Sequence, residues 1–264
     1  MSDTGPAVSR DGRVLRCRIT RGKHGTLDGE ALAEAGPALA ELAAADPADP
    51  DGIGAVLLTG EGASFCTGGN VRAFESASDR GGYVRELADT FHVFLQALVN
   101  CPVPTVAGVP GWAAGAGMSI VCATDLAVAG RSTRIRPAYP GIGFSPDGGM
   151  SWTLPRIVGA GRARHILLTD QVLDAETACA AGIFTTVVDD ADVLAEAEHT
   201  AHRVAQGPTA ALGRIKRLLA ATWDNDLATQ LDAEAASISA SAAGPEGAEG
   251  LTAFVEKRAP RFHT

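Results

Sequence analysis

The chain has 264 residues, of which 46% are hydrophobic, and its formal net charge is −9. This length and hydrophobic content predict one large globular domain, or a core with a small appendage. The acidic balance excludes the basic surface of a nucleic-acid-binding protein and does not favour an anionic membrane as a partner. No apolar run reaches the roughly 18 residues of a membrane-spanning helix.

The strands and helices of the first part of the chain alternate. An alternation of apolar and charged residues predicts a strand at 14–19, short apolar runs predict strands at 53–59 and 105–109, and 125–129 is a further strand candidate. The first is expected to be an edge or half-buried strand, and the second a buried parallel strand. Apolar residues at helical spacing predict helices over 27–45 and 83–100, whereas residues 1–12 are expected to form a frayed tail.

The last third of the chain is predominantly helical. Helical spacing recurs in six segments, 162–169, 175–181, 192–206, 209–224, 226–240 and 251–258. A short strand is predicted at 182–188 and a loop at 244–250. The sequence therefore predicts an α/β protein whose C-terminal region is helical.

The five cysteines and the N-terminus favour the cytoplasm. The cysteines are odd in number, widely scattered and without metal-ligand spacing: Cys17, Cys66, Cys101, Cys122 and Cys179. They are expected to be free, mostly buried thiols in a reducing compartment, and no metal site is expected. The polar first 12 residues lack the apolar segment of a signal peptide.

Two turns between Gly108 and Gly161 concentrate the candidate chemistry. The first, at 111–117, is rich in glycine and runs into the apolar segment 118–123. A turn of this kind leaves backbone N–H groups unpaired at a helix start, where they bind negative charge. The second turn, at 145–149, contains Asp147 at a position where packing does not require a carboxylate. We expect the two turns to face each other across one active site.

Three motifs resemble those of the crotonase superfamily, the enoyl-CoA hydratase/isomerase family, over about residues 14–263. Segments 56–71 and 104–117 resemble its two oxyanion-hole loops, and 249–262 resembles its C-terminal motif. The resemblance implies a spiral of ββα units in a core over 13–190 and a helical trimerisation region over 191–264. It also implies an acyl-CoA substrate, no cofactor beyond that CoA, and a homotrimer or dimer of trimers.

By the same resemblance, the backbone N–H groups of Gly69 and Ala116 form the oxyanion hole. Two such donors stabilise the enolate oxygen that develops when a thioester reacts next to its carbonyl. Further residues are expected to contact the substrate or its CoA moiety: Thr67, Gly68, Asn70, Val71, Trp112, Gly115, Gly117, Phe254 and Lys257. The last two resemble C-terminal residues that line the CoA site, often across a subunit contact.

The positions of the two hydratase glutamates correspond here to Ser119 and Tyr139, so neither is a carboxylate. Addition of water requires a positioned base and acid, and the chain is therefore not expected to be a hydratase. Asp147 instead resembles the catalytic aspartate of isomerase branches, where one carboxylate moves a proton between two carbons. A structural alternative is that Asp147 caps a helix beginning near Gly148.

Two other functions stay open at this point. His92, Tyr139 and Asp147 correspond to the histidine, tryptophan and nucleophilic aspartate of the branch that hydrolyses 4-chlorobenzoyl-CoA. In that branch the aspartate attacks the ring and the histidine activates water, although His92 can equally be an ordinary helix residue. The third hypothesis is a non-catalytic paralogue that binds CoA thioesters.

Overall fold

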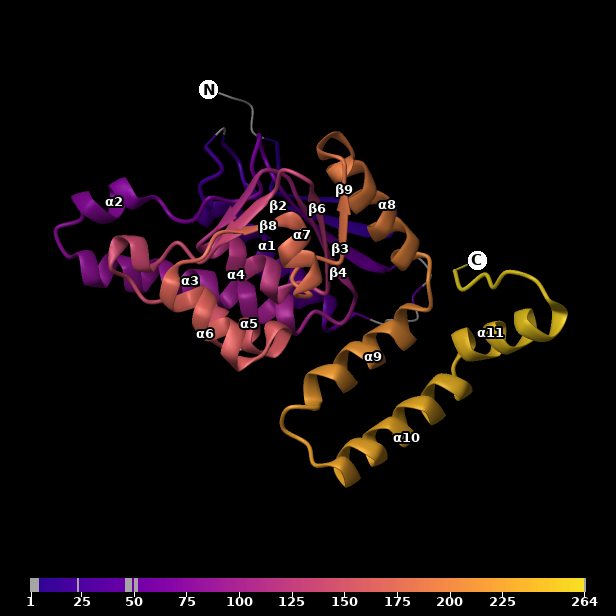
Figure 1. The fold of residues 1–264 in the computed structure, drawn as a ribbon. Coiled ribbons are helices and arrows are strands. Elements are labelled where there is room, and N and C mark those ends of the chain that lie inside the picture. Colours follow the sequence, from indigo (N-terminus) through magenta and orange to yellow (C-terminus); the bar gives the residue numbers. More distant parts are fainter. Residues whose placement is uncertain (1–4, 23, 46–48, 50–51, 264) are drawn as a thin grey trace.

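The computed structural model describes residues 5–22, 24–45, 49 and 52–263. Figure 1 shows a sheet at the centre of the molecule, helices packed around it, and an arm of C-terminal helices that projects from this body.

The larger sheet has six strands in the order β1-β2-β3-β4-β6-β9. Their bounds are β1 (Val8–Asp11), β2 (Val14–Thr20), β3 (Ala55–Gly60), β4 (Thr105–Val109), β6 (Leu126–Gly130) and β9 (Thr186–Val188). Strands β2 to β9 pair in parallel, while β1 is antiparallel to β2. The five predicted strands are confirmed as β2, β3, β4, β6 and β9, and β3 is parallel and buried as expected.

The expectation of a frayed tail over 1–12 is wrong for its second half. Residues Val8–Asp11 form β1, with Val8 opposite Cys17 and Asp11 opposite Val14, so β2 is not an edge strand. The turn at Gly12, whose φ is +57°, lets the chain reverse directly into β2. Residues 1–4 lie outside the described part of the chain.

The two faces of the larger sheet are covered by different helices. On one face lie α1 (Gly29–Leu42), α3 (Arg80–Val99) and α4 (Ala116–Ala123), which bury large apolar side chains against it. On the other face α8 (Val193–Ala205) packs with alanines at positions 197, 201 and 205. A four-residue alanine spacing gives α8 a flat apolar stripe, so it lies close to the strands.

The body also contains a second, smaller sheet and several further helices. A second sheet contains the short strands β5 (Trp112–Ala114), β7 (Arg134–Arg136) and β8 (Leu173–Asp174). The other helices of the body are α2 (Val71–Ser76), η1 (Pro140–Ile142), α5 (Met150–Val158), α6 (Ala160–Thr169), α7 (Ala175–Ala180) and η2 (Asp190–Asp192). This mixed α/β architecture is the fold class that the sequence predicts.

The arm consists of α9 (Thr209–Ala221), α10 (Leu227–Ala243) and α11 (Pro245–Glu256). The predicted loop at 244–250 is wrong, because α11 begins at Pro245, a residue suited to the first helical turn. The carboxylate of Glu246 accepts hydrogen bonds from the N–H groups of Ala210 and Ala211, at 2.9 and 3.1 Å. This carboxylate accepts from backbone N–H groups in the first turn of α9, which have no partner within the helix, and so connects α11 to the start of the arm.

The boundary predicted at 190/191 places α8 with the helical region, whereas α8 covers the sheet and the projecting helices begin at α9. Among the described residues, none of the helices is both long and apolar enough to cross a membrane. All five cysteines are free, and four of them are buried, as the sequence predicts.

Candidate active site

The two segments that resemble oxyanion-hole loops, 56–71 and 104–117, lie side by side, although their glycine turns are about 45 residues apart in the sequence. A parallel bridge pairs Cys66 with Ala113, and the Ala114 N–H donates to the Cys66 carbonyl at 2.8 Å. Directly after this bridge, Gly68 and Gly115 adopt φ values of +97° and +56°. A Cβ atom on Gly115 would lie 3.6 Å from the Gly68 Cα, so the two backbones are in contact. Glycine is required at both positions.

The amides of Gly69 and Ala116 border the same cavity, whose volume is about 720 Å³. In the described part of the chain, neither N–H has a hydrogen-bond partner. Ala116 is the first residue of α4, and its cap residue Gly115 provides no side-chain acceptor. The partial positive charge of the helix start therefore adds to the Ala116 donor. Two unpaired amides in one cavity can bind an oxyanion.

The other predicted substrate-binding residues divide into two groups. Five residues of the first two loops line the cavity: Thr67, Gly68, Asn70, Val71 and Gly115. Trp112 and Gly117 are not among the residues that line it. Trp112 is 39% exposed in β5, and Gly117 packs against the buried Cys66.

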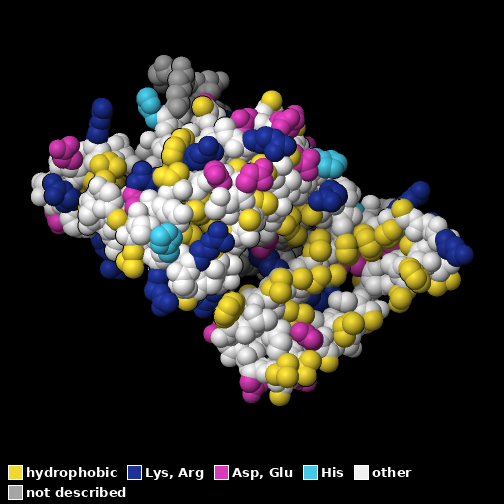
Figure 2. All heavy atoms as spheres, viewed as in Figure 1, with side chains coloured by type: hydrophobic (Ala, Val, Ile, Leu, Met, Phe, Trp, Pro, Cys, Tyr) yellow, Lys and Arg dark blue, Asp and Glu magenta, His cyan; other side chains and the backbone are white. Residues whose placement is uncertain are grey.

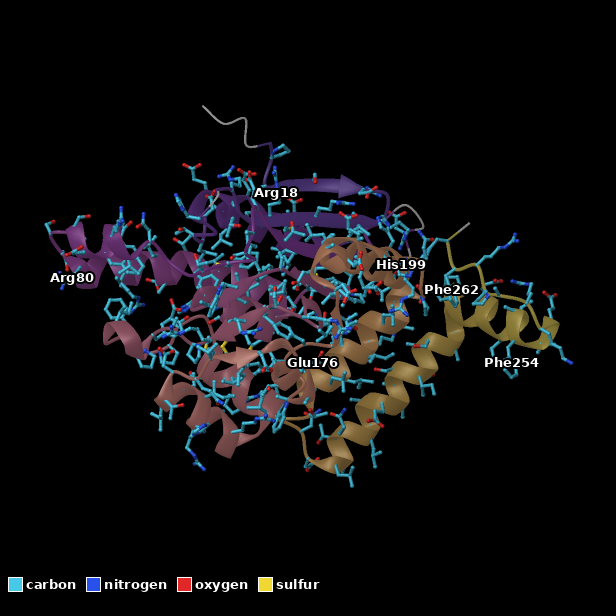
Figure 3. All side chains as sticks on the ribbon, turned by 45° about the horizontal axis from the view of Figure 1, so that its top comes forward. Arg18, Arg80, Glu176, His199, Phe254 and Phe262 are labelled. Atoms are coloured by element: carbon cyan, nitrogen blue, oxygen red, sulfur yellow. The ribbon has the colours of Figure 1, made fainter. Side chains whose placement is uncertain are left out.

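Phe254 and Lys257 lie far from the cavity of their own chain. Phe254 is 83% exposed on α11, at the opposite end of the molecule from Arg80, which borders the cavity (Figure 3). Lys257 follows α11 directly and adopts a left-handed conformation with φ of +55°. Neither side chain can reach the cavity of its own chain.

Asp147 also lines the cavity, and its side chain is hydrogen-bonded to a tyrosine. The Tyr139 hydroxyl donates to Asp147 Oδ1 at 2.7 Å. Burial and the neighbouring negative charge of Asp147 raise the pKa of the Tyr139 hydroxyl, so it stays protonated and remains a donor. Within the described residues, the other carboxylate oxygen of Asp147 has no hydrogen-bond partner. One oxygen is thus fixed and the other is available for proton transfer.

Ser119 supports this arrangement from a fully buried position on α4. Its hydroxyl lies 3.1 Å from the backbone carbonyl of Asp147 and 3.2 Å from the Tyr139 hydroxyl. Tyr139 donates its one hydroxyl proton to Asp147, so in both contacts of Ser119 the serine would have to be the donor. Since the serine hydroxyl also has one proton, it donates in only one of the two contacts at a time. The serine therefore links the aspartate backbone to the tyrosine that orients its side chain.

His92, on α3, contacts the backbone of the residue that follows Asp147. Its Nε2 atom accepts the Gly148 N–H at 3.2 Å, and His92 is not among the residues that line the cavity. An acceptor at Nε2 places the proton of the neutral ring on Nδ1. The lone pair that a general base would use is therefore engaged with the backbone.

The capping alternative for Asp147 is wrong. The residue at the cap of α5 is Gly149, with φ of +69°, and no side chain caps this helix. The carboxylate of Asp147 points instead to Tyr139. Helix α5 starts without a side-chain cap because the Asp147 backbone carbonyl accepts the Met150 N–H at 3.2 Å and closes the turn.

Comparison with known proteins places the chain in a family. The profile of the family described as enoyl-CoA hydratase/isomerase matches residues 10–264. The chain belongs to the enoyl-CoA hydratase/isomerase family. It is thus a member of the crotonase superfamily of acyl-CoA-transforming enzymes.

Relatives within the enoyl-CoA hydratase/isomerase family differ in their reactions. The 1,2-epoxyphenylacetyl-CoA isomerase of Escherichia coli is 35% identical over 80% of this chain and 82% of its own length. The 4-chlorobenzoyl coenzyme A dehalogenase-1 of an Arthrobacter species is 32% identical over 97% of this chain and 92% of its own. A solved enoyl-CoA hydratase from Polaromonas has a TM-score of 0.86, with 30% identity, and covers 96% of this chain and 98% of that one.

Two features of this family member were not predicted from the sequence. Ser119 is there only the position of a missing glutamate, whereas in the fold its hydroxyl contacts the Asp147 carbonyl and the Tyr139 hydroxyl. Phe74, Phe91 and Phe144 also line the cavity and carry no motif. Their segments meet only in three dimensions, so no local pattern could have revealed them.

Cys66, beside the first loop, is no nucleophile, because burial raises its pKa to about 12.

Proposed function

We propose that this enzyme shifts a double bond in an acyl-CoA substrate, with Asp147 as the acid/base and the amides of Gly69 and Ala116 as the oxyanion hole. One observation carries the proposal. Of the described residues that line the cavity, Asp147 is the only Asp or Glu, and it shares that cavity with the two unpaired amides. A single carboxylate opposite an oxyanion hole suits a reaction in which one proton leaves and returns.

The proposed reaction has two proton transfers. The free oxygen of Asp147 removes a proton from the α carbon of a 3-enoyl thioester, and the electron pair moves to the carbonyl oxygen. The Gly69 and Ala116 amides stabilise the resulting dienolate. The protonated Asp147 then returns the proton to the γ carbon, which leaves the 2-enoyl product. No water is consumed, and no cofactor beyond the CoA of the substrate is required.

A dehalogenase that uses Asp147 and His92 is the second candidate. It is favoured by the 32% identity to the Arthrobacter dehalogenase over nearly the whole chain, and by the position of His92 next to Gly148. The hydrogen bond at His92 Nε2 weighs against it, since this nitrogen would have to accept a proton from water. We therefore place isomerisation first.

We also propose that the chain forms a homotrimer or a dimer of trimers through its arm. None of the residues of α10 is buried, and large apolar side chains are exposed along all three helices of the arm, as Figure 2 shows. Such an apolar surface is stabilised when a partner covers it. Phe254 and Lys257 would then border the CoA site of a neighbouring subunit. Sedimentation equilibrium measures the mass, and a monomer at micromolar concentration contradicts this proposal.

The decisive experiment compares wild type with Asp147→Asn on 3-enoyl-CoA and 4-halobenzoyl-CoA. We expect wild type to isomerise the 3-enoyl substrate and the variant to lose about 10²- to 10⁴-fold in kcat, the usual contribution of a positioned acid/base. Asp192→Asn is the matched control, because Asp192 is exposed and does not line the cavity. Consumption of the halobenzoyl substrate alone would show the isomerase proposal to be wrong in favour of the dehalogenase.

A further inference from the structure

Aromatic side chains are concentrated around the active-site cavity. The chain contains 13 Phe, Trp and Tyr residues among its 264, yet five of them, including both tyrosines, line this cavity. These five are Phe74, Tyr83, Phe91, Tyr139 and Phe144. The core elsewhere is packed mainly with Ala, Val, Leu and Ile. The aromatic character is therefore a property of this cavity rather than of the chain.

Three of these rings form one cluster from three separate segments. The Phe74 ring, on α2, lies 6.2 Å from the Phe144 ring with an interplanar angle of 22°. It lies 6.3 Å from the Tyr83 ring, on α3, at 63°. All three residues are only half-buried and border the cavity. Their packing against one another leaves ring surface available to a ligand.

Two aromatic rings, Phe74 of this cluster and Phe91 outside it, lie near the two ends of the proposed reaction path. A Cβ on Gly69 would lie 2.5 Å from Phe74 Cζ, so this ring lies beside the oxyanion donor. A Cβ on Gly148 would lie 2.5 Å from Phe91 Cε1, so that ring lies against the residue that follows Asp147. An acyl group with its carbonyl oxygen at the donors and its reacting carbon at Asp147 has an aromatic ring near each end.

We propose that the preferred substrates carry an aromatic ring in the acyl group, close to the thioester. The inference rests on the proposed function, because the roles of Gly69, Ala116 and Asp147 fix where the acyl group lies. Aromatic pairs in stacked or edge-to-face geometry gain affinity beyond the burial of apolar area, between about twofold and tenfold per contact. A linear aliphatic chain gains only from the buried area.

Binding of three unreactive thioesters with eight acyl carbons tests this inference. Isothermal titration calorimetry of the full chain with phenylacetyl-CoA, cyclohexylacetyl-CoA and octanoyl-CoA gives the affinities without turnover. We expect phenylacetyl-CoA to bind at least about fivefold more tightly than octanoyl-CoA, although apolar area alone favours octanoyl. Cyclohexylacetyl-CoA is expected to resemble octanoyl-CoA. Equal or tighter binding of octanoyl-CoA, or binding of none of the three, overturns the inference.

Phe144→Leu and Phe74→Leu locate the preference. Each is expected to reduce the ratio of phenylacetyl to octanoyl affinity by at least about twofold, whereas a purely structural role for the ring would weaken both ligands alike. Phe262→Leu, in the C-terminal segment, is the control and leaves the ratio unchanged. Full turnover of the Asp147→Asn variant would contradict the proposed function, whereas the affinity ratio tests only the preference for an aromatic acyl group. The two failures are therefore distinguishable.

Discussion

The two sides of the cavity are built by different means. On the amide side, Gly69 and Ala116 present backbone donors whose positions depend on glycine conformations and on a single bridge between Cys66 and Ala113. On the carboxylate side, Asp147 depends on hydrogen bonds from the side chains of Tyr139 and Ser119. The first side should therefore respond to added backbone strain, and the second to single missing hydroxyl groups.

The largest effect below the loss of Asp147 is expected from Gly115→Ala. A side chain at φ of +56° and next to Gly68 shifts the start of α4 and with it the Ala116 donor. Loss of one oxyanion donor costs about 10²- to 10³-fold in kcat. Gly159→Ala is the matched control, since Gly159 has φ of +81° in open space. Steady-state kinetics should show a loss only for Gly115→Ala; equal losses would show that backbone strain in general is responsible.

Tyr139→Phe tests the carboxylate side and is expected to reduce kcat by about tenfold. The variant removes the donor to Asp147 Oδ1 while the ring remains. A hydrogen bond to a charged group is worth about 1.5–3 kcal/mol, and this one fixes the orientation of the carboxylate that must reach the substrate carbon. Without this donor we expect kcat to fall while KM stays near the wild-type value. A variant with wild-type kcat would argue against a role for Tyr139 in positioning the base.

Ser119→Ala is expected to reduce kcat by a smaller factor, about two- to fivefold, and to lower the free energy of unfolding by about 0.5–1.5 kcal/mol. The serine is fully buried, and its loss leaves the Asp147 carbonyl without this donor. Urea denaturation and kinetics measured on one preparation give both quantities. A change in stability with no change in kcat would limit Ser119 to packing.

His92→Gln is expected to have the smallest effect, within about threefold of wild-type kcat on a 3-enoyl-CoA. His92 does not line the cavity, and Gln retains an acceptor for the Gly148 N–H. The dehalogenase mechanism instead requires His92 as a base, which is worth about 10²-fold or more. Kinetics of this one variant on both substrate types therefore distinguish the two candidate reactions.

Local patterns were sufficient for much of the fold. The strands at 53–59 and 105–109 are short apolar runs between breakers, and both lie in the centre of the larger sheet. Strand β1 and helix α2 were missed because Val8–Asp11 is polar after its first residue and Val71–Ser76 is only six residues long. Long-range pairing and packing stabilise such short elements, and a sequence window does not contain these partners.

The sequence by itself determined the family, the fold class and the absence of both hydratase glutamates, because these are properties of motifs along one stretch of chain. Only the tertiary structure decided that Ser119 and Tyr139 contact Asp147, that His92 faces a backbone amide, and that aromatic rings from three segments share one cavity. A hydrogen bond or a ring contact depends on distances of a few ångströms. Such distances between residues far apart in sequence are set by the packing of the whole body.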